Sequence, residues 1–265
     1  DDVAAEYDEL YSKIVKKFQD TFFDAEGNMT AQTQTAHIVA LYFQLTPEKY
    51  ITKTVEGLKR LLDKENGHLV TGFVGTPYFC HALSQNHSLK EAYDLLLKED
   101  FPSWLYQVKK GATTIWEHWD GMKPDGSMWS PDMNSFNHYS FGAVGAWMYN
   151  YSLGIERDEN FPGFKHFVLK PEVDTCGNMT YAKGYYDSMY GRIESSWRVE
   201  EDAVIYQCTV PANTTATLHL PATSVKNIVE GNRTLKKSKG IEYVGIEDGR
   251  LVLRLLAGRY SFGIK

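Results

Sequence analysis

The spacing of apolar residues changes once along this chain, and the change limits the folds open to it. Before about residue 161 apolar residues recur at steps of three and four, as in Val3, Tyr7, Leu10, Ile14 and Phe18, the period of an amphipathic helix. Beyond it they alternate, as in 193–199, 204–210 and 251–255, the period of strands with one buried face. The sequence therefore predicts an α+β chain, with helices over 1–160 and an antiparallel β-sandwich over 161–265.

The helical part reads as about seven helices, joined by short connections that favour antiparallel pairs. One of them, at 35–45, is apolar almost all round and is expected to be buried on most sides. Thr46-Pro47 and Thr76-Pro77 each have the pattern of an N-cap followed by proline at the first helical position.

Composition excludes some classes of function. The formal net charge is −6, whereas a nucleic-acid or anionic-membrane partner would require a basic patch. No apolar run approaches the roughly 20 residues of a membrane span. Aromatic residues make up 14% of the chain, with 17 Tyr and 6 Trp, more than a core of this size needs, so we expect some of them to face a ligand.

Neither a metal nor a cofactor is expected. The three cysteines are scattered, the histidines never adopt HExxH spacing, and a Gly-rich phosphate loop and a GxSxG elbow are both missing from the sequence. The chain begins Asp1-Asp2-Val3, with neither an initiator Met nor a signal peptide, which we interpret as a processed or truncated piece. The compartment, periplasmic or cytoplasmic, is therefore not predicted.

The segment 111–142 carries the residues best suited to chemistry. Gly and Pro punctuate it, so it is predicted to be a loop, and a loop of roughly 30 residues is usually functional. It interleaves tryptophans with carboxylates and one histidine: Trp116, Trp119, Trp129, Glu117, Asp120, Asp125, Asp132 and His138. Flat rings offer stacking faces to a pyranose, while carboxylates and histidine provide hydrogen bonds and proton transfer. This composition predicts an acidic sugar-binding pocket.

Several longer runs carry a family resemblance: GHLVTGFVGTPYFCHALSQN, AYDLLLKEDFPSWLYQVKKGATTIWEHWDG, MNSFNHYSFGAVGAWMY, YDSMYGRIESSWRV and VPANTTATLHLPA. Over nearly the whole chain they resemble bacterial inverting α-L-rhamnosidases, and the TTIWE-x-W-D and MNSFNHY-x-FG spellings are specific. The resemblance implies the end of an (α/α)6 barrel of helical hairpins, followed by a C-terminal β-sandwich. Such a barrel has twelve helices, so the resemblance also implies that the chain is incomplete.

The resemblance assigns a catalytic role to one residue. Glu117, within TTIWE, matches the family's general base. Inversion needs a second carboxyl group, the general acid, roughly 6.5 to 9.5 Å away. In the family that acid is a Glu in an Asp/Arg-rich motif ending in Gly-Trp, upstream of the part matched here, and no such motif occurs in these residues. We therefore expect the acid to lie upstream of this chain, which alone would be inactive.

Substrate contacts are expected from neighbouring residues. His138, in SFNHY, would donate a hydrogen bond to a sugar hydroxyl or to the surroundings of the attacking water. Trp116 and Trp119 are sugar platforms or core residues, and Asp120 binds a hydroxyl or turns the loop.

Two residues of PSWLYQV belong to the same prediction. Trp104 and Tyr106 would line the same cavity, although aromatic residues on a short helix are commonly core. The expected ligand is a rhamnose-containing oligosaccharide or glycoside, and the expected macromolecular partner is the missing N-terminal part or a second copy.

Two other functions remain open at this stage. One is a non-catalytic carbohydrate-binding fragment, which the lack of the acid favours. The other is a different (α/α)6 glycosidase, acting on glucosides or uronides, which only a panel of substrates would distinguish.

Overall fold

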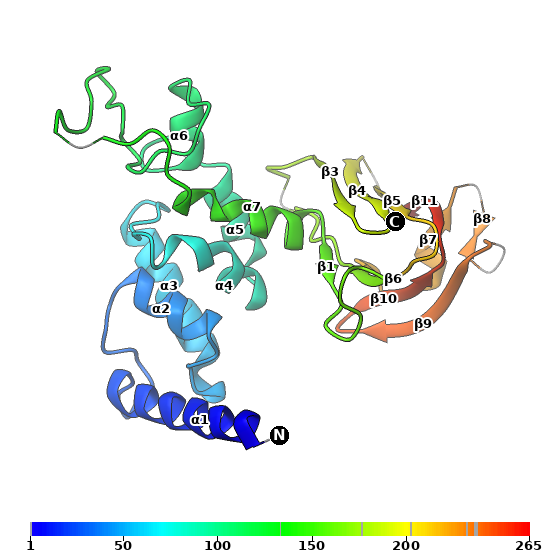
Figure 1. The fold of residues 1–265 in the computed structure, drawn as a ribbon, viewed down its shortest axis with the longest axis horizontal. Helices are drawn as coiled ribbons and strands as arrows, with labels where there is room; N and C mark the ends of the chain where they lie inside the picture. The colour runs from blue at the N-terminus through cyan, green and yellow to red at the C-terminus, as the bar shows by residue number, and fades with distance from the viewer. Residues whose placement is uncertain (1, 133, 176, 202, 232, 236–237) are drawn as a thin grey trace. The chain divides into compact units, whose positions relative to one another are not determined.

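A computed structural model describes residues 2–132, 134–175, 177–201, 203–231, 233–235 and 238–265. The chain forms two compact units, divided between Val144 and Gly145. The first is helical and the second is built mainly of strands (Figure 1), which confirms the expected fold class. The last helical turn, Met148–Ser152, belongs to the second unit. The boundary between the two compact units therefore lies before the residue at which the apolar spacing changes from helical to alternating. The division at 160/161 stays a prediction.

Seven α-helices lie in the described residues, as the apolar spacing indicated. They are α1 (Asp2–Phe22), α2 (Gln34–Tyr42), α3 (Ile51–Lys64), α4 (Phe79–Gln85), α5 (Leu89–Leu96), α6 (Trp104–Lys109) and α7 (Val144–Trp147). Short 3-10 turns at Glu48–Tyr50, Thr76–Tyr78 and Ser140–Ala143 precede α3, α4 and α7. In α2 both apolar and polar residues are buried, among them Ile38, Leu41 and His37.

The two predicted Thr-Pro caps are wrong as hydrogen-bonded caps. Pro47, rather than Thr46, occupies the N-cap position of the turn before α3, with no side-chain bond, and the Thr46 hydroxyl is buried without a partner in the described part of the chain. The Thr76 hydroxyl instead lies 2.8 Å from that of Thr71. Tertiary contacts, rather than the helix ends, therefore determine the surroundings of these two hydroxyls. A capping side chain is found at Ser103, whose Oγ accepts from the Tyr106 N–H at 3.1 Å.

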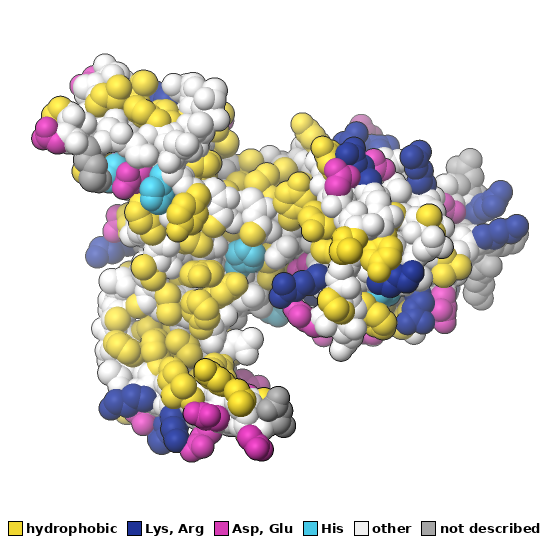
Figure 2. Space-filling view, in the orientation of Figure 1, with side chains coloured by type: hydrophobic (Ala, Val, Ile, Leu, Met, Phe, Trp, Pro, Cys, Tyr) yellow, Lys and Arg dark blue, Asp and Glu magenta, His cyan; other side chains and the backbone are white. Residues whose placement is uncertain are grey.

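The helix α1 is amphipathic, but its apolar stripe lies in solvent. Five stripe residues are between 48 and 66% exposed: Val3, Tyr7, Leu10, Tyr11 and Ile14. Figure 2 shows hydrophobic side chains gathered on the surface of the helical unit. An apolar stripe of this kind is normally buried against another element. The stripe is therefore suited to contact further helices, as the predicted partial barrel requires.

The second unit contains two sheets. One has the order β1 (Ile155–Arg157), β2 (His166–Leu169), β6 (Thr215–Leu220), β10 (Arg250–Leu255), β9 (Ile241–Glu247). The other has the order β3 (Tyr181–Ser188), β4 (Gly191–Glu200), β5 (Ala203–Val210), β11 (Gly258–Ile264), β7 (Ile228–Glu230), β8 (Arg233–Thr234). Among the described strands, β2 and β6 pair in parallel and the other pairs are antiparallel. Buried residues of both sheets, such as Leu218, Leu253, Trp197 and Phe262, form the core.

Gly154 makes the turn from the last helical residues into β1. Its φ of +69° lies in the left-handed region, and a Cβ there would stand 2.2 Å from the carbonyl carbon of Lys170. Only glycine fits this turn. Within the described part of the chain, no helix combines the length and apolar character needed to cross a membrane.

Candidate active site

Backbone pairing brings Glu117 and His138 to neighbouring segments of the helical unit. The Glu117 N–H donates to the Ser135 carbonyl at 3.0 Å, and the His138 N–H donates to the Ile115 carbonyl at 2.8 Å. The Thr114 hydroxyl also donates to the Phe136 carbonyl. Two parts of the loop that are 21 residues apart in sequence therefore run side by side (His138 against Glu117). Glu117 itself is half-buried.

The amide of Gln107, on α6, holds the backbone on both sides of Glu117. Its Oε1 accepts from the Trp116 N–H at 3.3 Å, and its Nε2 donates to the His118 carbonyl at 3.2 Å. Gln107 is only 3% exposed. Because one rigid amide binds the residues before and after Glu117, the position of this carboxylate is tied to the helix α6.

Trp119 and Trp104 belong to an aromatic cluster around Phe141. The Trp119 ring stacks on Phe141, with centroids 3.9 Å apart and an interplanar angle of 7°. Trp104 meets Trp119 edge-on at 5.5 Å and donates from Nε1 to the Phe141 carbonyl at 2.8 Å. Trp104 is buried, whereas Trp119 is half-buried. Trp119 thus has ring surface left for a ligand, and Trp104 positions it.

His138 is oriented by a hydrogen bond and by stacking. Its Nδ1 accepts from the Ser140 N–H at 3.3 Å, so the ring proton of the neutral imidazole is on Nε2. The ring stacks with Phe73 at 4.6 Å and with Tyr139 at 5.4 Å, nearly parallel to both. Phe73 also contacts Phe141 at 5.3 Å, which links His138 to the aromatic cluster.

Trp116 is packed more tightly than a sugar platform would be. It is 4% exposed and meets Phe136 edge-on, with centroids 5.0 Å apart. A Cβ at Gly121 would lie 3.2 Å from both of these rings, so a larger residue would displace them. This burial favours a structural role for Trp116, and its predicted contact with sugar stays a prediction.

The negative charge of Asp120 acts on the phenol of Tyr106. The Tyr106 hydroxyl donates to the Met122 carbonyl at 2.9 Å. Burial raises the pKa of Tyr106, and the negative charges of Asp120 and Asp125 raise it further. Tyr106 is therefore a neutral donor that secures the loop, while Asp120 remains half-buried.

The outer part of the loop is held by local turns and one ring pair. Asp125 accepts from the backbone and hydroxyl of Ser127 at 2.9 and 2.7 Å, as in an Asx turn. The His118 imidazole stacks on Trp129 with centroids 3.7 Å apart, and its Nε2 is buried without a partner in the described part of the chain.

Three residues that define this geometry were not expected from the sequence. The sequence gives no sign of the role of Gln107, since a single glutamine on a short helix belongs to no recognisable motif. Phe73 and Phe141 lie inside runs that carry the resemblance, but their stacking depends on contacts between distant segments. The predicted site residues of 111–138 lie outside the named helices and strands, and Trp104 and Tyr106 lie on α6. Their roles in binding stay predictions.

Comparison with protein families matches both units. Residues 1–152 match the model described as the bacterial alpha-L-rhamnosidase 6 hairpin glycosidase domain, and residues 154–235 match the bacterial alpha-L-rhamnosidase C-terminal domain.

Comparison with individual proteins identifies relatives of the same family. An alpha-L-rhamnosidase of Streptomyces avermitilis is 34% identical over 98% of this chain and 24% of its own length. One from Formosa agariphila is 30% identical over 98% of this chain and 28% of its own length. This chain thus spans about a quarter of the length of these relatives.

Solved structures share the fold. A crystal structure of the Streptomyces avermitilis alpha-L-rhamnosidase complexed with L-rhamnose has a TM-score of 0.88 at 34% identity, over 99% of this chain and 24% of that one. The native enzyme from Aspergillus terreus has a TM-score of 0.84 at 28% identity, over 99% of this chain and 27% of that one. The chain therefore belongs to the bacterial alpha-L-rhamnosidase family of 6 hairpin glycosidases.

Proposed function

We propose that this chain provides the general base and part of the sugar site of an enzyme that removes terminal α-L-rhamnose with inversion. The observation that carries the proposal is the environment of Glu117. Its backbone is paired with the segment of His138 and is held on both sides by Gln107. A catalytic carboxylate needs such fixed support, because misplacement by about 1 Å can cost about 100-fold in rate.

In the proposed reaction, Glu117 accepts a proton from a water molecule. The water oxygen attacks the anomeric carbon of the rhamnose, on the face opposite to the glycosidic oxygen. The bond from that carbon to the glycosidic oxygen breaks, and the general acid upstream protonates the leaving oxygen. The product is β-L-rhamnose, and the two carboxyl groups end with exchanged protonation states.

His138 would act as a hydrogen-bond donor to the sugar. Because its Nδ1 accepts from Ser140, its Nε2–H is free to donate to a hydroxyl. The stacking with Phe73 and Tyr139 restricts rotation of the ring. The remaining face of Trp119, whose other face is covered by Phe141, would stack on the sugar ring.

The test is the release of nitrophenol from an aryl α-L-rhamnoside by this chain and by the same chain extended upstream through the rest of the barrel. We expect turnover only in the extended polypeptide, with β-L-rhamnose as the first product in time-resolved NMR. First formation of the α anomer would contradict inversion. Turnover by this chain alone would show that the acid is among these residues.

A non-catalytic carbohydrate-binding role is the second candidate, since no residues matching the family's acid motif occur in the sequence. It predicts that the extended polypeptide binds L-rhamnose and hydrolyses no glycoside from a panel of rhamnosides, glucosides and uronides. Hydrolysis of a glucoside or uronide instead would indicate another (α/α)6 glycosidase.

A further inference from the structure

The outer face of the second sheet contains a hollow, which lies entirely within the strand unit. The hollow measures about 540 Å³ and is lined by residues of β3, β4, β5 and β11. This volume falls in the range of about 300 to 1,000 Å³ that is usual for ligand sites. All of its lining residues belong to the strand unit, whereas the residues of the candidate active site all precede 145.

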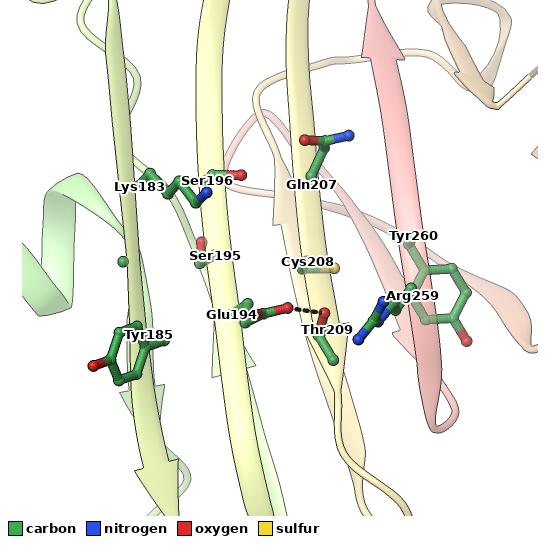
Figure 3. Close-up of a pocket in the computed structure, with 11 residues that line it drawn as sticks. Lys183, Tyr185, Glu194, Ser195, Ser196, Gln207, Cys208, Thr209, Arg259 and Tyr260 are labelled. Carbon is green, nitrogen blue, oxygen red and sulfur yellow. Dashed lines mark hydrogen bonds between the residues drawn. The ribbon is translucent and has the colours of Figure 1, made fainter.

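Strand register arranges the lining side chains in two rows across the sheet. One row is Tyr185, Glu194, Thr209 and Arg259, and the next is Lys183, Ser196 and Gln207; Ser261 on β11 continues the second row outside the lining. Figure 3 shows the labelled members of both rows lying side by side across the four strands. At about 4.8 Å between strands, a row spans about 14 Å, which suits a short oligosaccharide.

One end of the hollow is held rigid. The Arg192 guanidinium lies over the Tyr185 ring, 3.7 Å from its centroid. Asp187 holds the same guanidinium through two contacts of 2.8 and 3.0 Å. These contacts restrain the Tyr185 ring, which lowers the conformational entropy lost when a ligand binds.

The charges of the hollow favour an anionic ligand. Glu194 is the carboxylate of the lining, and it accepts from the Thr209 hydroxyl at 2.6 Å. Lys183 and Arg259 are exposed, and neither forms an ion pair with a carboxylate among the described residues. The lining therefore has an excess of positive charge, in a chain whose net charge is −6.

The remaining lining groups suit sugar hydroxyls. Gln207 donates to the Ser261 hydroxyl at 3.3 Å, and its carbonyl oxygen, like the hydroxyls of Ser196 and Thr209, can exchange hydrogen bonds with a ligand. Hydroxyl, amide and aromatic side chains beside two cations fit a sugar that bears a carboxylate. We propose that this sheet face is a saccharide site, which binds an acidic, uronate-containing oligosaccharide and shares no residue with the candidate active site.

The experiment is calorimetric titration with trigalacturonate of the polypeptide that has been extended upstream. Maltotriose, which is neutral, is titrated in parallel for comparison. K183A and R259A are each expected to weaken trigalacturonate binding about tenfold, because each removes a charge-assisted hydrogen bond. K226A is the matched control, since Lys226 is an exposed cation of the same unit outside the hollow. It should leave the affinity unchanged.

Hydrolysis of an aryl rhamnoside should be the same in all three variants, which separates this proposal from the proposed function. Thermal unfolding of each variant checks that it folds. The proposal is overturned if trigalacturonate does not bind saturably, if K183A and R259A bind it as tightly as K226A does, or if maltotriose binds equally well.

Discussion

Replacing Gln107 by leucine isolates the support of Glu117 from its chemistry. The Gln107→Leu side chain is similar in size but can bind neither the Trp116 N–H nor the His118 carbonyl, which Gln107 now bonds at 3.3 and 3.2 Å. A buried backbone group that loses its partner costs about 1 to 3 kcal/mol. Both bonds are long, so we expect about 1 kcal/mol each and a loss of about 2 kcal/mol in the free energy of unfolding.

The larger effect should be on turnover. With the backbone released on both sides, Glu117 is free to move away from the attacking water, and we expect kcat to fall about 100-fold. KM should change little, because the base acts on the water in the transition state rather than on the bound sugar. The assay is steady-state hydrolysis of an aryl α-L-rhamnoside by the extended polypeptide, with chemical denaturation measured on the same samples.

Gln34 provides a matched control. Its buried amide accepts from the Val70 N–H at 2.8 Å and donates to the His68 carbonyl at 3.0 Å, so it holds the backbone on both sides of Leu69 in the same manner. Gln34→Leu should lower stability at least as much, yet keep far more of the turnover. If both variants lose turnover equally, Gln107 acts through general stability and the reasoning is refuted.

Three further predictions follow from the described contacts. Phe73→Ala should raise KM about two- to tenfold, because a stacking pair with His138 is worth about 0.5 to 1.5 kcal/mol, whereas Phe43→Ala, which removes a similarly exposed ring, should leave KM unchanged. Leu10→Asp should alter the unfolding of this chain by less than about 0.5 kcal/mol but destabilise the extended polypeptide by more than about 2 kcal/mol, if further helices cover the α1 stripe; equal effects in both would contradict that cover. Burial raises the pKa of Glu156 above its ordinary 4.5, so the folded state favours the protonated acid and stability falls as pH rises from about 4.5 to the folded pKa. Glu156→Gln should flatten this part of the curve of unfolding midpoint against pH, and an unchanged curve would exclude Glu156 as its source.

Periodicity predicted the architecture because packing on one face leaves a repeating signal in the sequence. The stripe of α1 and the alternation of β10 both correspond to elements of the structure. Caps were harder to predict, because a threonine before a proline can bond elsewhere. The Thr76 hydroxyl forms a hydrogen bond with the hydroxyl of Thr71, and this pairing depends on tertiary contacts.

The loop 111–142 shows the same limit. Its composition indicated sugar chemistry, and the resemblance pointed to Glu117 and His138. The pairing of their segments, the amide of Gln107 and the stack of Phe73 on His138 join parts of the chain that are separated in sequence. A single sequence carries no periodic signal for such contacts, so they emerged only from the structure.

The most direct test of Glu117 as the general base is the turnover of Glu117→Gln beside Asp120→Asn in the extended polypeptide. Both changes remove one carboxylate from the same half-buried stretch of the loop, so effects of charge and folding are matched. The account predicts that Glu117→Gln lowers kcat by at least about 100-fold with unfolding unchanged, since the amide cannot accept the proton of the attacking water. It also predicts that Asp120→Asn retains far more activity. Near-wild-type turnover of Glu117→Gln would contradict the account.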